Sequence, residues 1–191
     1  MQENNFINEW WGKSHMPASV CRAECIKEKS EKYWLDAVKV VSVRNPWIHQ
    51  VSRFFLNYYE LTGKKIPYGN SIEPKLYTEL IKLFKDHMKK PQATISSDYY
   101  NRNWEIYTID GKIIADVIFR LEDVPGSIRK LAKHLNCDYN DIMKCFNGYI
   151  DHASSSYVSR YDYKDFYDDE VKDIVYNARK KEIDHYGYKF E

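Results

Sequence analysis

The sequence feature that most constrains the fold is a short run of valines that ends at a proline corner and leads directly into a helical pattern. Residues 37–43 hold four valines with little polar alternation, which predicts a strand buried on both faces. The corner is Arg44-Asn45-Pro46, and the aromatic pattern that begins at Trp47 predicts a helix that stops near Gly63. A buried strand that turns at once into a helix is typical of an α/β fold with a mostly parallel sheet.

Two side chains at this corner suggest a place for a phosphate. Arg44 stands at the carboxyl end of the predicted strand, and Ser52 follows eight residues later, about two turns into the helix. Ligands of open α/β sheets bind outside the carboxyl ends of the strands, and a guanidinium offers a planar fork of donors matched to phosphate oxygens. Without a ligand, Arg44 would be an ion-paired arginine at a strand end and Ser52 an ordinary helical serine.

The rest of the sequence predicts further helices and strands, all within one domain that spans residues 1–191. An irregular lead-in covers residues 1–16, and Asp110-Gly111 predicts a tight hairpin turn, because both residues tolerate positive φ. The strands expected beside that turn are 104–108 and 112–119. Helices are expected at 17–34, 73–88, 125–135, 138–146 and 168–185.

Composition excludes some classes of function. The 191 residues carry a formal net charge of +1, so no global field attracts nucleic acid or a membrane surface. No run approaches the roughly 18 apolar residues of a membrane span, and four cysteines are too few for a dense disulfide framework. We therefore expect a soluble, cytoplasmic protein, with a membrane anchor on a missing N-terminus as the alternative.

Three segments, in order, resemble one enzyme family. Arg44-Asn45-Pro46-Trp47 with Ser52 resembles the 3'-phosphate-binding segment of sulfotransferases that use 3'-phosphoadenosine 5'-phosphosulfate (PAPS), in particular the carbohydrate, uronosyl 2-O-like branch. The middle segment contains Trp104, Asp110-Gly111, Asp116, Phe119, Arg120 and Glu122. The last contains Tyr163-Lys164-Asp165-Phe166-Tyr167 and the stretch from Asp184 to Phe190, so the likeness spans about residues 15–190.

The resemblance implies a P-loop-like sulfotransferase fold, with a mostly parallel central sheet flanked by helices. It also implies transfer of a sulfuryl group from PAPS to a hydroxyl, with a carbohydrate as acceptor and no metal. Arg44 and Ser52 would hold the 3'-phosphate of the cofactor. Lys164 would face the same cofactor if the loop over residues 154–163 folds over the adenosine; otherwise it is a surface lysine. His15 would act as the general base, since its position ahead of the strand is similar; otherwise it is a helix-flanking histidine without a catalytic role.

The chain departs from the family pattern in ways that leave alternatives open. Ile48-His49 replaces the usual Asp-Arg, and Lys164 replaces an arginine, which keeps the charge but loses bidentate geometry. Nothing in residues 1–40 matches the glycine-rich phosphosulfate loop, so we expect the N-terminal strand and its loop to be missing. The alternative is a catalytically inactive binding or oligomerisation module, able to pair with a second copy through an exposed sheet edge. Stacking on single-stranded nucleic acid is a third hypothesis, which the net charge of +1 and the lack of a Lys/Arg-aromatic repeat disfavour.

Overall fold

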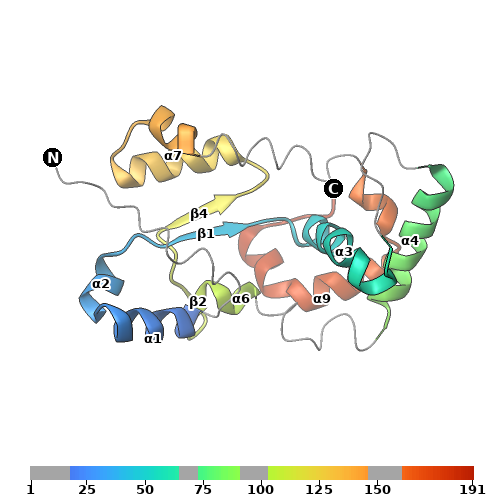
Figure 1. The fold of residues 1–191 in the computed structure, drawn as a ribbon, viewed down its shortest axis with the longest axis horizontal. Helices are drawn as coiled ribbons and strands as arrows, with labels where there is room; N and C mark the ends of the chain where they lie inside the picture. Colours follow the sequence, from blue (N-terminus) through green and yellow to red (C-terminus); the bar gives the residue numbers. More distant parts are fainter. Residues whose placement is uncertain (1–17, 65–72, 91–102, 146–160) are drawn as a thin grey trace.

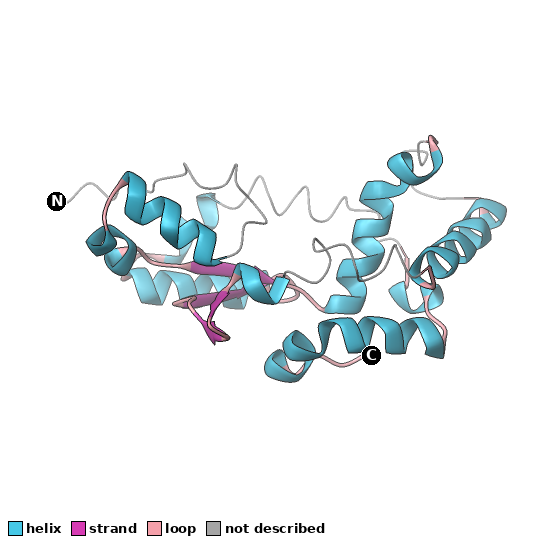
Figure 2. Cartoon of the chain, turned by 90° about the horizontal axis from the view of Figure 1, so that it is seen from below, coloured by secondary structure: helices cyan, strands magenta, loops and turns pink. Residues whose placement is uncertain are grey.

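The protein is described by a computed structural model that covers residues 18–64, 73–90, 103–145 and 161–191. These residues form an α/β fold that is mostly helical and contains a small parallel sheet. Figures 1 and 2 show an elongated molecule, with the sheet toward one end and a group of long helices toward the other. The predicted lead-in and His15 lie outside the described residues.

The parallel sheet consists of β1 (Val40–Val43) and β4 (Val117–Arg120), paired in register from Val40 opposite Val117 to Val43 opposite Arg120. The α/β class is therefore confirmed, but the described sheet has two strands. The prediction that residues 37–43 form a strand buried on both faces is wrong, because β1 is shorter and Val40 is 44% exposed. In the described part of the chain, β1 has a neighbour along one edge only, so less of its surface is covered.

Helix α3 (Pro46–Thr62) follows β1 directly and begins and ends as its sequence predicts. The Asn45 side chain accepts a hydrogen bond from the Trp47 N–H, Pro46 occupies the first turn, and Gly63 ends the helix at φ +68°. Because Asn45 is both the corner residue and the cap, the position of Arg44 relative to α3 is fixed by backbone geometry. The predicted helix over residues 47–63 is confirmed.

The main core lies between α3, α4 (Pro74–Met88), the 3₁₀ helix η3 (Tyr163–Phe166) and α9 (Asp169–Tyr186). Apolar positions on one face of each helix produce this packing, and aromatic rings meet edge-on at its centre, where Phe84 is fully buried. The helices predicted at 73–88 and 168–185 are thus confirmed almost to the residue.

A second, smaller core joins β4 to α7 (Val124–Leu135). The Ser127 hydroxyl accepts a hydrogen bond from the Arg120 N–H at 2.8 Å, and it also donates to the Arg120 carbonyl at 3.1 Å. Helix α7 is thereby attached to the carboxyl end of β4. The helix predicted over 125–135 is confirmed, and the next one is helical over residues 139–145.

The predicted hairpin turn is confirmed, although its strands are very short. Asp110 and Gly111 have φ of +52° and +74°, between β2 (Thr108–Ile109) and β3 (Lys112–Ile113). The strand predicted over 104–108 is wrong in its first part, because Trp104 belongs to a single helical turn, α6 (Asn103–Ile106).

The first predicted helix divides into α1 (Ala18–Glu28) and α2 (Glu31–Asp36). Ser30 begins the second of these by accepting a hydrogen bond from the Tyr33 N–H. None of the helices in the described ranges is long and apolar enough to cross a membrane.

Candidate anion-binding site at the end of the parallel sheet

Arg44 lies at the carboxyl end of β1, where the sheet meets the C-terminal helix. Its side chain lines a small cavity of about 10 Å³, roughly the space of one water molecule. The other lining residues are Val43, Tyr107, Glu182, Tyr186 and Tyr188. Burial lowers the pKa of the Arg44 guanidinium, and the negative charge of Glu122 opposes this shift. The group nevertheless stays charged at neutral pH, because arginine is not deprotonated in proteins.

No hydrogen bond or ion pair joins the Arg44 guanidinium to any described residue, although two carboxylates lie near it. Glu122 accepts a hydrogen bond from the Asn45 N–H and another, at 3.5 Å, from the Tyr188 hydroxyl. Glu182 accepts from the Tyr107 hydroxyl at 2.6 Å and pairs with Arg179. Both carboxylates are thus engaged by other donors, and the guanidinium keeps its hydrogen-bonding capacity.

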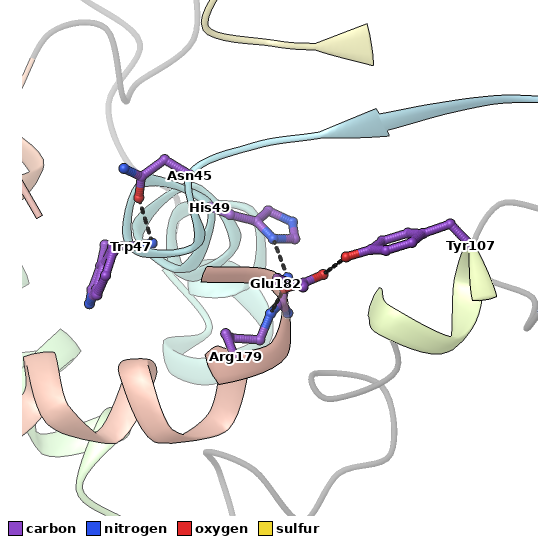
Figure 3. Close-up of polar contacts among 6 residues, drawn as sticks. All are labelled: Asn45, Trp47, His49, Tyr107, Arg179 and Glu182. Atoms are coloured by element: carbon purple, nitrogen blue, oxygen red, sulfur yellow. Dashed lines mark hydrogen bonds and ion pairs between the residues drawn. The ribbon is translucent and has the colours of Figure 1, made fainter. Parts of the chain in front are cut away.

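The contacts of Glu182 belong to a buried polar network beside the cavity (Figure 3). The side chains of Arg179 and Glu182 are only 2% and 6% exposed. Arg179 sits at a kink of α9, with non-helical φ and ψ of −115° and 19°, and its Nη2 lies 3.5 Å from the Nδ1 of His49 on α3. Burial and the Glu182 charge raise the pKa of Tyr107 far above its ordinary value, so its hydroxyl stays a donor at neutral pH. The network joins α3, α9 and the residue that follows α6.

Aromatic rings form one wall of the site. The Arg120 guanidinium lies over the rings of Tyr186 and Tyr188, at 5.6 and 5.2 Å from their centres, and donates to the Tyr186 carbonyl at 2.9 Å. Burial raises the pKa of Tyr186 to about 12. The cation at the end of β4 therefore fixes the C-terminal tyrosines around the cavity that Arg44 lines.

The other predicted site residues are placed differently. Ser52 is half-buried on α3; it does not line the cavity, and its side chain makes no hydrogen bond to a described residue. Lys164 is exposed on η3, which packs against α3 and α4, and no contact brings it to Arg44 within the described ranges. His15 lies outside the described residues. Of the predicted set, Arg44 alone is found at the cavity.

The sequence prediction missed Tyr107, Arg179 and Glu182. A signal for the last two exists, because the buried residues of α9 recur at 171, 175, 179, 182 and 183, the spacing of a helix face turned to the core. Charged residues at two of those positions indicate a buried ion pair. This signal is hard to recognise, because three consecutive basic residues, Arg179-Lys180-Lys181, are typical of a solvent-exposed helix face.

No family model matches the chain, and no curated protein or solved structure matches it either.

Proposed function

We propose that the chain is a PAPS-dependent sulfotransferase acting on a carbohydrate hydroxyl, and that Arg44 holds the 3'-phosphate of its cofactor. The observation that supports the proposal most is the availability of the Arg44 guanidinium for hydrogen bonding. Its guanidinium stands at the carboxyl end of a parallel strand, lines a cavity and has no hydrogen-bonding partner in the described structure, while both nearby carboxylates are engaged elsewhere. A phosphate would supply the missing bidentate acceptor.

The spatial arrangement of the three resembling segments supports this proposal. Arg44 comes from the first segment, Arg120 and Glu122 from the second, and Tyr186 and Tyr188 from the third. Arg44, Tyr186 and Tyr188 line one cavity at the end of the β1–β4 pair, and Arg120 and Glu122 contact these tyrosines. Up to 144 residues separate the segments that touch. Segments that resemble one family in order and also converge on one site are expected if the site performs that family's function.

The proposed reaction needs a base and a held cofactor. The acceptor oxygen attacks sulfur and forms a new S–O bond, the bond between sulfur and the bridging phosphate oxygen breaks, and 3'-phosphoadenosine 5'-phosphate (PAP) leaves. His15 would take the proton of the acceptor hydroxyl, since its ordinary pKa is close to neutral pH. Arg44 would hold the 3'-phosphate, which takes no part in the bonds that change, so its role is binding and orientation.

Calorimetry with two ligands tests the proposal. PAP carries the 3'-phosphate and adenosine 5'-phosphate lacks it, so the native chain should bind PAP at least about tenfold more tightly, given the strength of charge-assisted hydrogen bonds. The variant Arg44→Ala should bind the two ligands equally. Arg129→Ala, which changes an exposed arginine of α7, is the matched control and should keep the preference. Equal affinity of the native chain for both ligands, or no heat with either, would contradict the proposal.

A second candidate function is self-association, and the edge of β1 favours it. The Lys39 and Val43 carbonyls accept hydrogen bonds from residues at the two ends of β4, so residues 39, 41 and 43 point their backbone groups toward that strand. Val40 and Ser42 therefore point theirs to the other edge, where no strand of the described chain pairs with them. An antiparallel pair centred on Val41 places Val40 opposite Ser42 of a second copy and brings no like charges together.

Sedimentation velocity distinguishes this candidate from the first. Self-association through β1 predicts a dimer that Val40→Lys converts to a monomer, because an edge lysine blocks strand pairing. Val20→Lys on α1 is the control, since Val20 is 40% exposed and Val40 is 44% exposed. A native chain that sediments as a monomer, or a Val40→Lys variant that remains a dimer, would rule out pairing through this edge.

A further inference from the structure

We propose that Arg179 is a positioning residue: by holding Glu182, it prevents that carboxylate from pairing with Arg44 and so keeps Arg44 available for an external anion. This inference rests on the proposed function, because it explains how the phosphate-binding arginine remains without a partner in the protein. It assigns a role to a buried ion pair that does not itself touch the phosphate.

Glu182 and Arg44 line the same cavity. A carboxylate attached to the protein competes with a dissolved phosphate ester as an intramolecular ligand, and it needs no encounter to do so. Arginine forms its strongest contacts with such groups, as bidentate pairs. A Glu182 carboxylate without another partner would therefore occupy Arg44.

Both carboxylate oxygens of Glu182 already accept hydrogen bonds. The Tyr107 hydroxyl donates to Oε1 at 2.6 Å, and the Arg179 Nε donates to Oε2. These donors come from different elements, because Tyr107 follows α6 and Arg179 lies at the kink of α9. The kink places the guanidinium of Arg179 beside a carboxylate only three residues further along the chain, with both side chains shielded from water. Water therefore does not compete for the contact between Arg179 and Glu182.

Glu122, the other carboxylate near Arg44, also accepts hydrogen bonds from donors other than Arg44. It accepts from the Asn45 N–H and from the Tyr188 hydroxyl. Two carboxylates from separate elements are thus each directed to donors other than Arg44. Arg179 is the only one of these donors that carries a full positive charge, so its loss should change the site most.

The test compares PAP affinity in four proteins by calorimetry: the native chain, Arg179→Gln, Glu182→Gln and the double variant. Arg179→Gln should weaken PAP binding about tenfold or more, because Glu182 is released to Arg44. Glu182→Gln should bind PAP more tightly than the native chain, since a negative charge beside the phosphate is removed. The double variant should regain at least the native affinity, which a purely structural role of Arg179 does not predict. A double variant as weak as Arg179→Gln would overturn the inference.

A second readout keeps the test decisive if the native chain fails to bind PAP. Phenylglyoxal modifies free guanidinium groups, and peptide mass spectrometry gives the modification rate of Arg44 in each protein. The rate should fall in Arg179→Gln and recover in the double variant; equal rates in all four would overturn the inference. Absence of PAP binding together with the predicted modification pattern would contradict the proposed function alone. If Arg179→Gln does not fold, Tyr107→Phe releases one oxygen of Glu182 instead and should give a smaller fall in rate, reversed by Glu182→Gln.

Discussion

The buried Arg179–Glu182 pair gives a quantitative prediction for stability. With side chains 2% and 6% exposed, neither charge can be solvated if its partner is removed. Glu182→Leu should therefore lower the free energy of unfolding by about 3–5 kcal/mol, because it leaves the Arg179 charge without its partner. Arg179→Met should lower it by less, because Glu182 is then free to pair with Arg44 across the cavity. The double variant removes both charges, and an apolar pair of similar volume is close to neutral. It still leaves the buried Tyr107 hydroxyl without its acceptor, which costs about 1–3 kcal/mol.

The double variant should accordingly be more stable than Glu182→Leu, with a coupling free energy of at least about 1 kcal/mol. Adding Tyr107→Phe removes the buried hydroxyl that the double variant leaves without an acceptor. The triple variant should therefore be within about 1 kcal/mol of the native chain in its free energy of unfolding. Urea unfolding followed by circular dichroism measures these values, provided that the dependence on urea is unchanged between variants. Additive effects of Arg179→Met and Glu182→Leu would refute the reasoning, because they would mean that the two charges do not depend on each other.

Three further predictions concern the elements around the site. Ser127→Ala should cost about 1–3 kcal/mol in urea unfolding, since it leaves the Arg120 N–H without an acceptor under α7; an unchanged midpoint would contradict this. Gly187→Ala should cost about 1–2 kcal/mol by the same assay, because φ at the end of α9 is +66°, and no loss would mean that the left-handed conformation is not required. Asp168 caps α9, and the Val171 N–H holds the pKa of its carboxylate below the ordinary value, so its contribution is present at neutral pH and is lost as the pH falls below about 4. Asp168→Ala should cost about 1 kcal/mol at pH 7 in thermal melts and nothing at low pH; a loss that persists in acid would contradict this.

The long helices could be predicted from sequence because their ends carry strong local signals. Asn45-Pro46 and Gly63 mark the ends of α3, and the proline at the start of α4 acts in the same way. The break between α1 and α2 was missed because Ser30, a good N-cap, lies inside a continuous helical pattern. Trp104 was assigned to a strand from its aromatic character, whereas it belongs to a helical turn.

Only the part of the site that depends on residues adjacent in sequence could be predicted. The position of Arg44 is of this kind, because it follows from the corner between the strand and the helix. Its surroundings depend on contacts between distant segments, such as Tyr107 with Glu182, 75 residues apart. Strand exposure had the same limit, because whether a valine run is covered depends on which elements pack against it, and Val40 is left partly exposed.

A crystal structure of the chain with PAP would show directly whether Arg44 holds the 3'-phosphate of the sulfuryl donor's nucleotide. We expect the 3'-phosphate at the carboxyl end of β1, with its oxygens within about 3 Å of the Arg44 guanidinium. A nucleotide bound elsewhere, with Arg44 paired to Glu182 or Glu122, would contradict this expectation.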